Sequence, residues 1–438
     1  MKQIKYLTMI FALALIAFAC KPTIDVPAPT AGTANFTTYV ALGNSLTSGY
    51  TDGELFASGQ KNSYPSMLAK QFAFAGGKGE FKQPLMLDEV GFGQRRKLAL
   101  VQATDGSVSL GVIGYGGTVN PQNFTTTATV GPFNNMGVPG AKSYHLAFKG
   151  YGNPANAPNY NPYYTRFATS TTSSVLEDAL AQNPTFYTLW IGNNDVLGYA
   201  LAGGSSDAIT PLPTFTGSIT AVVQALNAKG AKGVIGNIPD VLSIPFFTTV
   251  PYNALAITDA NSVAALNAAY GNGALGISFK VCANAFVIKD PAAPRGMRQV
   301  KSDELVLLTL PTDSIKLKGW GSLKPIPANY ILDETEIASI KKAVSDYNQA
   351  ISTIASASGI PVVDMNTNFK QIQSGLIYNG MKFNASFITG GTFSLDGVHM
   401  NARGYALVTN YFIDVINSYY KSTVPKVDVG SYPGIVFP

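Results

Sequence analysis

The sequence has few of the residues on which cross-linked or metal-dependent folds rely. Its 438 residues include only two cysteines, Cys20 and Cys282, and two histidines, His145 and His399. So few cysteines exclude a disulfide scaffold, and stability has to come from a hydrophobic core. Two distant histidines and a free cysteine give no recognisable ligand cluster, which argues against metal catalysis. We therefore expect no metal and no cofactor.

Charge is also scarce. Charged residues make up 13% of the chain and hydrophobic residues 46%, enough for one large core or two modest ones. The formal net charge of +5 is small for this length, and no basic cluster is interleaved with aromatic residues. Nucleic acid is therefore not an expected partner. No second apolar run approaches a membrane-spanning length, so any membrane attachment would be through a lipid.

The N-terminus carries an export signal. Lys2 and Lys5 precede an apolar run from about residue 6 to 18, which is too short for a spanning helix. Because the run ends in Ala-Phe-Ala before Cys20, it resembles a bacterial lipoprotein signal over residues 1–19, and a plain secretory signal is the alternative. The resemblance implies a lipidated Cys20 and a cell-envelope location, either at the outer membrane or on the periplasmic face.

A tether and a folded domain follow. Residues 20–35 are rich in Pro, Thr, Ala and Gly, which favours a flexible tether. Residues 36–438 then alternate helical and strand patterns, which is typical of a parallel sheet. Two stretches interrupt this rhythm, at about 76–130 and 245–327. We interpret both as β-rich insertions near the substrate site.

Four short blocks along the domain carry residues suited to catalysis. They are Gly43-Asn44-Ser45-Leu46, Asn135-Met136-Gly137-Val138-Pro139-Gly140, Gly192-Asn193-Asn194-Asp195 and Asp396-Gly397-Val398-His399. Ser45 follows an apolar run that predicts a strand, and ligands bind at the carboxyl ends of strands in open α/β sheets. Any histidine base has to be His145 or His399, and only His399 has an acid three residues before it.

The four blocks stand in the order found in the GDSL, or SGNH, hydrolases, which this chain resembles from about residue 37 to 420. The resemblance implies a three-layer α/β/α sandwich with a flavodoxin-like parallel sheet. It also implies a catalytic triad of Ser45, Asp396 and His399, and an oxyanion hole built from Ser45, Gly140 and Asn194. One departure is Asn44, where family members usually carry Asp. Asn retains an acceptor for the loop and loses the charge.

The chemistry of the triad follows from the residue types. A serine hydroxyl is a weak nucleophile until an imidazole takes its proton, and a carboxylate fixes the tautomer of that imidazole. The α/β-hydrolase alternative requires G-x-S-x-G, which the block around Ser45 lacks. The segment Gly137–Ser143 is not interpreted as a phosphate-binding loop, because its glycines are not spaced as that motif requires.

Structural roles stay open for several of these residues. Asn194 and Asp396 are suited to capping helices, and Gly140 is suited to an ordinary turn. His145 is expected to be a structural or pocket-lining residue. The functional prediction is a serine hydrolase that cleaves small-molecule, lipid or glycan carboxylic esters. The alternatives are a carbohydrate O-deacetylase and a non-catalytic, lipid-anchored binding protein, and the sequence does not indicate an oligomeric state.

Overall fold

A parallel five-stranded sheet forms the centre of the molecule. The computed structural model describes residues 27–78, 80–92, 97–112 and 130–438, so the predicted signal segment and Cys20 lie outside the described residues. The strand order is β13-β6-β5-β1-β4. The strands are β1 Tyr39–Gly43, β4 Asn135–Gly137, β5 Phe186–Trp190, β6 Lys232–Gly236 and β13 Val362–Val363. Counted along the chain this order is 2-1-3-4-5, the flavodoxin-like arrangement.

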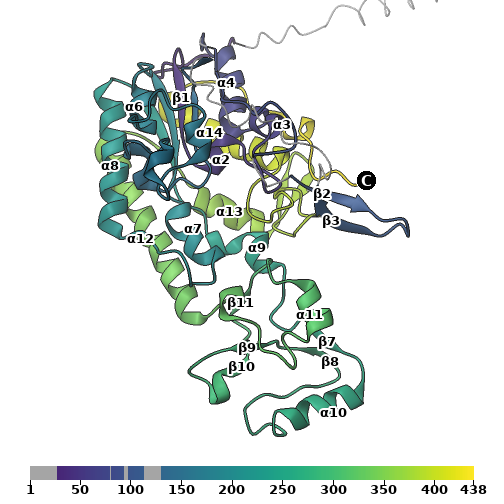
Figure 1. The fold of residues 1–438 in the computed structure, drawn as a ribbon. Coiled ribbons are helices and arrows are strands. Elements are labelled where there is room, and N and C mark those ends of the chain that lie inside the picture. The colour runs from purple at the N-terminus through teal and green to yellow at the C-terminus, as the bar shows by residue number, and fades with distance from the viewer. Residues whose placement is uncertain (1–26, 79, 93–96, 113–129) are drawn as a thin grey trace, which may run out of the picture.

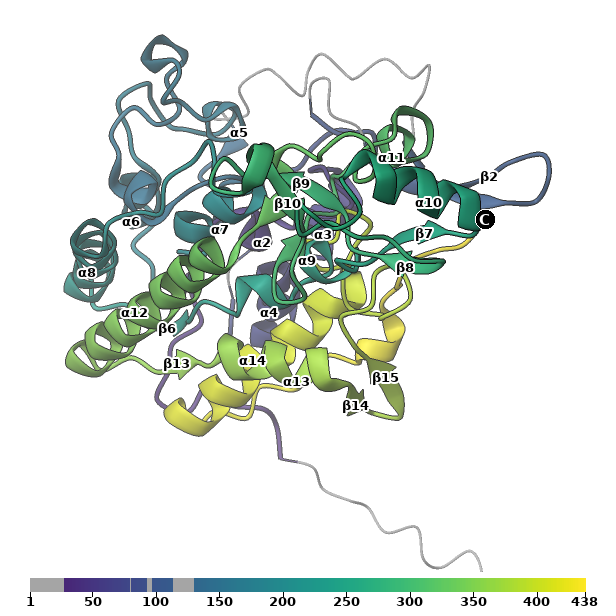
Figure 2. The same cartoon turned by 90° about the horizontal axis from the view of Figure 1, so that it is seen from below.

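Helices cover both faces of this sheet. This is expected, because the strands carry apolar side chains on both faces and both faces have to be buried. All residues of β1 and β5 are buried. Figures 1 and 2 show α6 (Val175–Leu180), α8 (Leu212–Ala228) and α12 (Glu334–Ser358) on one face, with α4 (Tyr64–Phe74) and α14 (Ala402–Tyr420) on the other. The predicted three-layer α/β/α architecture is therefore confirmed.

The helix boundaries follow capping signals that the sequence displays. Ser63 caps α4, and Pro65 lies in its first turn. Ser174 and Glu177 form a capping box at the start of α6, and Asp333 forms one with Glu336 at the start of α12. Helix α8 begins at Leu212 without a side-chain cap, so no capping residue marks its start in the sequence.

The first interruption of the rhythm contains a β-hairpin. Strands β2 (Leu98–Gln102) and β3 (Val108–Val112) pair in antiparallel fashion, and the hairpin projects from the main body in Figure 1. The rest of the predicted insertion at 76–130 is irregular in the described residues, and residues 113–129 lie outside them.

The second interruption forms a lobe below the main body in Figure 1. It holds short strands together with the helices α10 (Ala260–Ala269) and α11 (Thr312–Lys318). Two small apolar clusters of its own, which include Phe286 and Tyr270, stabilise it. The lobe is thus mixed where a β-rich insertion was expected, because its Ala-rich segment is helical and the apolar run at 304–310 contains only the short strand β11 (Leu305–Val306).

The end of the predicted tether is docked against the body. Thr33 donates its backbone N–H to the carbonyl of Tyr420, and Thr423 donates to the carbonyl of Thr30. These bonds hold residues 30–33 against the end of α14. The flexible tether predicted for residues 20–35 therefore does not include them. Across the described ranges, no helix is long and apolar enough to cross a membrane.

Candidate active site

The four sequence blocks meet at one edge of the sheet. Ser45 follows β1, Gly140 follows β4 and Asn194 follows β5, and these three strands are neighbours in the order β5-β1-β4. Their carboxyl ends lie at the point where the strand order reverses, which is where open α/β sheets bind ligands. His399 and Asp396 reach the same edge from the loop before α14.

Ser45 begins a four-residue helix, α2 (Ser45–Ser48), directly after β1. The chain turns sharply there because Gly43 has no side chain: a Cβ would lie 2.1 Å from Thr47 Oγ1 and 2.4 Å from the Trp190 carbonyl. Asn44 caps the helix by accepting the Leu46 N–H at 3.1 Å. The acceptor of the usual Asp is thus retained, while the Nδ2 that replaces its second oxygen is buried without a partner among the described residues.

An unbroken line of hydrogen bonds joins the three predicted triad residues. Asp396 Oδ2 lies 2.8 Å from His399 Nδ1, and His399 Nε2 lies 2.9 Å from Ser45 Oγ. A carboxylate can only accept, so Nδ1 carries the ring proton and Nε2 is left to accept the proton of the serine hydroxyl. The structure therefore brings Ser45, Asp396 and His399 together in the arrangement required of a nucleophile, a base and its orienting acid.

The acid of this line is held in its ionised form. Burial alone would raise the pKa of Asp396, but His399 and the backbone N–H groups of Val398 and His399 lower it well below its usual range. Both N–H groups donate to Oδ1 at 2.8 Å. Asp396 is thus the cap of its own loop as well as the partner of the imidazole, so the two roles proposed for it coexist.

The three predicted oxyanion-hole residues line one cavity with the triad. Gly140 has φ +79, a backbone conformation that favours glycine, and the only atom near a Cβ there would be Asn161 Nδ2 at 4.0 Å. Asn194 is the first residue of α7 (Asn194–Leu201), and its Nδ2 donates to the Ala141 carbonyl at 3.0 Å. That bond orients the amide, so its second N–H remains available for a ligand.

Contacts that the sequence did not reveal hold these residues in place. The buried Asp195 accepts both the N–H and the hydroxyl of Ser143 at 2.7 Å, tying the block after β5 to the block after β4. Asn161 donates to the Pro139 carbonyl at 2.8 Å, directly before Gly140. Asn135 donates to the Thr47 carbonyl at 3.0 Å, in the helix that begins at Ser45. Only spatial proximity identifies these contacts, since Asp195 and Ser143 are 52 positions apart.

The second histidine has a structural position. His145 Nδ1 accepts the backbone N–H of Lys142 at 3.0 Å, and its ring stacks on Tyr151 with centroids 4.4 Å apart. Burial and the nearby Lys142 lower the pKa of His145 to about 4. It is not among the residues that line the cavity. In the part of the chain that the structure describes, no group of three or more His, Cys, Asp or Glu residues could hold a metal ion.

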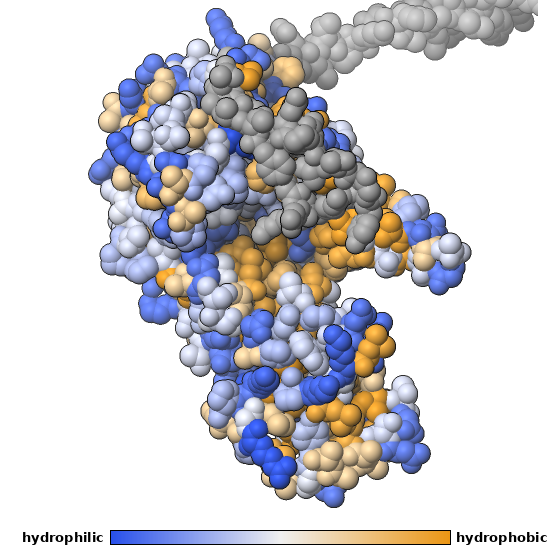
Figure 3. All heavy atoms as spheres, in the orientation of Figure 1, coloured by the Kyte–Doolittle hydropathy of each residue, from blue (hydrophilic) through white to orange (hydrophobic). Residues whose placement is uncertain are grey.

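The cavity beside Ser45 measures about 620 Å³ and is mainly apolar. Its apolar walls are Leu98, Leu110, Pro139, Leu197, Leu201, Phe246, Leu308, Leu395 and Val398. Both interruptions of the helix–strand rhythm contribute: Leu98 and Leu110 come from the hairpin, and Leu308 comes from the base of the lobe. In Figure 3 apolar surface gathers between the main body and the lobe and at the base of the hairpin.

Comparison with solved structures finds distant matches, two of which are described as lipases. The chain is 11% identical to the lipase/acylhydrolase from Enterococcus faecalis, covering 89% of this chain and 98% of that one, with a TM-score of 0.34. It is 14% identical to an extracellular lipase from Streptomyces rimosus, covering 87% of this chain and 99% of that one, with a TM-score of 0.35. These likenesses are distant and carry no argument about substrate.

The comparison with curated proteins found no significant match. The family assignment therefore rests on a family model, which matches residues 39–412 and describes a GDSL-like lipase/acylhydrolase. The matched range includes all four blocks and both insertions. This chain belongs to the GDSL-like lipase/acylhydrolase family.

Proposed function

We propose that the protein hydrolyses a carboxylic ester through an acyl-serine intermediate on Ser45. The observation that carries this proposal is the continuous hydrogen-bonded line from Asp396 through His399 to Ser45, with bonds of 2.8 and 2.9 Å. These are the distances at which a base takes a proton from a hydroxyl. Family membership supports the reaction class, and the roles of the individual residues are our proposal.

In the acylation step, Ser45 Oγ forms a bond to the ester carbonyl carbon while His399 Nε2 takes the serine proton. The carbonyl oxygen becomes an oxyanion, for which the N–H groups of Ser45 and Gly140 and the Asn194 amide are the donors. Each such donor contributes roughly 3–4 kcal/mol to transition-state stabilisation. The bond to the alcohol oxygen then breaks, and His399 gives its proton to the departing alcohol.

In the deacylation step, water replaces the alcohol. His399 takes a proton from water as the water oxygen bonds to the acyl carbon, and the bond to Ser45 Oγ breaks as that oxygen recovers a proton. The products are a carboxylic acid and the free enzyme. Throughout, the ionised Asp396 keeps the ring proton on Nδ1 and stabilises the imidazolium.

The shape and polarity of the cavity support an acyl group with an extended apolar part. Its volume of about 620 Å³ falls within the range of roughly 300–1,000 Å³ that is typical of small-molecule sites. Among the described residues that line it, Asp396 and His399 are the only Asp, Glu, Lys, Arg or His residues. An acetyl group would leave most of this apolar surface in contact with water, so we favour longer acyl chains over acetate.

Chromogenic esters of increasing acyl length test the proposal. Each methylene buried in the cavity contributes about 0.8 kcal/mol, so kcat/KM should rise up to about fourfold per added methylene until the cavity is filled. Ser45→Ala and His399→Ala should remove turnover and leave the unfolding temperature intact, and a serine-reactive phosphonate should label Ser45. The exposed Ser205→Ala is the matched control. Undiminished turnover by Ser45→Ala would disprove the mechanism.

The same panel separates the two alternative functions. A carbohydrate O-deacetylase would favour acetylated sugars over longer acyl esters and show no gain with chain length. A non-catalytic binding protein would turn over none of these esters. The assembled line from Asp396 to Ser45 argues against that second alternative, because binding alone does not require a base within 2.9 Å of a hydroxyl.

We also propose that the mature chain begins at an acylated Cys20 and is anchored to the cell envelope. The support comes from the N-terminal sequence, in which a short apolar run ends in Ala-Phe-Ala-Cys. Mass spectrometry of the membrane fraction should find the lipidated N-terminal peptide, and Cys20→Ser should release the protein into the soluble fraction. Recovery of a soluble wild-type form with unmodified Cys20 would argue for a plain secretory signal instead.

A further inference from the structure

A tight turn lies directly behind the catalytic acid. Thr51 and Glu54 exchange two backbone hydrogen bonds of 3.1 Å, and between them Asp52 and Gly53 have φ values of 50 and 78. These positive values are typical of a two-residue hairpin turn, in which Asp-Gly is a favoured pair. The turn therefore has a fixed backbone from which N–H groups and a carboxylate project in defined directions.

This turn bonds to the segment that carries the catalytic acid. Gly53 donates its N–H to Asp396 Oδ2 at 3.0 Å, beside the bond from His399. Asp52 donates its N–H to Ser394 Oγ at 3.0 Å, and that hydroxyl donates onward to Asp396 Oδ1 at 2.9 Å. Asp52 Oδ1 accepts the N–H of Leu395 at 3.1 Å. Both oxygens of Asp396 are thus held in place from the turn.

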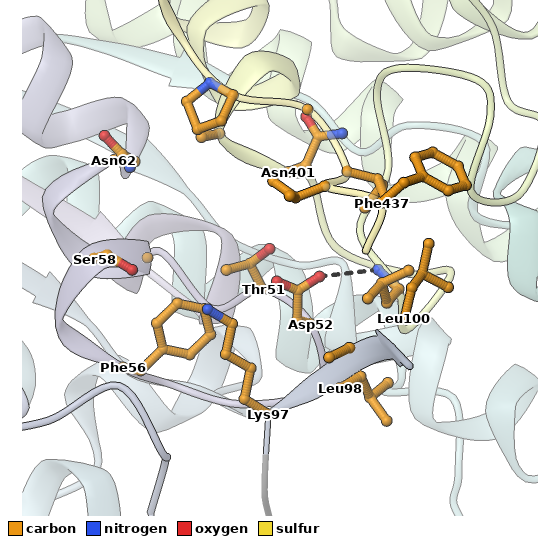
Figure 4. Close-up of a pocket in the computed structure, with 18 of the residues that line it drawn as sticks. Thr51, Asp52, Phe56, Ser58, Asn62, Lys97, Leu98, Leu100, Asn401 and Phe437 are labelled. Atoms are coloured by element: carbon orange, nitrogen blue, oxygen red, sulfur yellow. Dashed lines mark hydrogen bonds between the residues drawn. The ribbon is translucent and has the colours of Figure 1, made fainter. Parts of the chain in front are cut away.

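Burial makes these bonds difficult to replace. Ser394 is 0% exposed, so water cannot take over its two hydrogen bonds. The carboxylate of Asp52 lines a second cavity of about 340 Å³, which shares only Leu98 and Leu395 with the cavity beside Ser45. Figure 4 shows Asp52 in this second cavity with Lys97 nearby, and the bond of its carboxylate as a dashed line. Asp52 therefore bonds to the catalytic loop from outside the substrate site.

The surroundings of Asp52 on balance raise the pKa of its carboxyl above the ordinary value. Burial and the neighbouring Asp396 raise the pKa of Asp52, whereas the Leu395 N–H, Lys97 and His399 lower it. The Gly53 N–H and the Ser394 hydroxyl lie on the Asp396 side of the turn and donate to that carboxylate. These donors stabilise the negative charge of Asp396 beside the Asp52 side chain.

We propose that Asp52 is a positioning residue for the reaction on Ser45: its N–H and carboxylate hold the Ser394–Asp396 segment so that Asp396 faces His399. This inference rests on the proposed function. Asp52 touches neither substrate nor the reacting atoms. Its effect is on the direction of the Asp396 carboxylate, and a displacement of about 1 Å in such a group lowers the rate of a catalysed reaction by about a hundredfold.

Variants of Asp52 in the full-length chain test the proposal. Asp52→Ala removes the acceptor of the Leu395 N–H, and we expect kcat to fall about 10- to 100-fold with little change in KM. Asp52→Asn has the same shape and retains an acceptor oxygen, so it should recover most of the lost kcat. The rate of Ser45 labelling by a phosphonate should fall and recover in parallel. Equal losses in both variants, or wild-type kcat in Asp52→Ala, would overturn the proposal.

Two further variants keep the test decisive. Ser394→Ala removes the hydroxyl between Asp52 and Asp396 and should also lower kcat, so it decides the question if Asp52→Ala does not fold. Asn62→Ala is the control, because Asn62 lines the same second cavity outside this network. Wild-type activity that depends on Ser45 but is unaffected by Asp52→Ala would disprove only the positioning role. A wild-type chain without esterase activity would disprove the proposed function itself.

Discussion

Replacing Asp396 with Asn changes one atom at the centre of the site. The side chain accepts hydrogen bonds at both oxygens: Oδ1 from the Ser394 hydroxyl and the Val398 and His399 N–H groups, and Oδ2 from the Gly53 N–H and the His399 ring. An Asn side chain has one acceptor oxygen. Three donors meet at the Oδ1 position, so the oxygen of the Asn side chain occupies that position and its NH₂ group replaces Oδ2.

The NH₂ group of the substituted side chain would then face two donors. To avoid a clash, His399 has to move its proton from Nδ1 to Nε2, which turns Nε2 from an acceptor into a donor toward Ser45. The base is lost even though every side chain keeps its place. A change of tautomer of this kind lowers kcat by about 10⁴-fold, which corresponds to about 5 kcal/mol in the activation barrier.

The same substitution also affects stability. The Gly53 N–H loses its acceptor, which costs about 1–3 kcal/mol. The folded-state pKa of Asp396 is lowered, so its contribution to stability is present above the ordinary carboxyl pKa and is lost as the pH falls through the folded-state value. In Asp396→Asn this acid-side dependence should disappear. The assays are kcat and KM on a chromogenic ester, beside thermal unfolding at pH 7 and in acid. A variant that is destabilised but fully active would refute the reasoning and remove Asp396 from the triad.

Three further predictions concern the surrounding residues. Asn194→Ala should lower kcat about 10²- to 10³-fold with little effect on KM, as measured by steady-state kinetics; an unchanged kcat would exclude Asn194 from the oxyanion hole. Gly140→Ala should destabilise the fold by about 1 kcal/mol, because φ is +79, and should also lower kcat; unchanged unfolding would contradict the strain argument. Because the pKa of His145 is lowered to about 4, this ring is neutral at pH 7, and its share of stability should be lost as the pH falls from about 6.5 to about 4. His145→Asn keeps an acceptor for the Lys142 N–H, and its acid unfolding curves should no longer show this loss of stability. If the loss persists in His145→Asn, it is due to other groups.

The sequence by itself indicated the candidate residues Ser45, Asp396 and His399 and a parallel sheet with helices, for local reasons, while the three-layer flavodoxin-like order was implied by the resemblance to the SGNH hydrolases. Ser45 follows an apolar run that predicts a strand, and His399 is one of only two histidines and has an acid three residues before it. The apolar strands and the capping residues Ser63, Ser174 and Asp333 are also short-range signals. Such signals operate within a few residues of the chain, so a single sequence is sufficient to read them.

The tertiary structure alone decided what holds the site in place. The bond from Asp52 to Ser394 joins positions 342 residues apart, and nothing in the local pattern around either residue indicates it. The bonds from Ser143 to Asp195 also join residues far apart in the sequence, and so do the contacts by which Leu98, Leu110 and Leu308 line the cavity. The mixed composition of the lobe at 245–327 was also missed, because short helices and strands there are stabilised by packing with one another and not by intrinsic propensity.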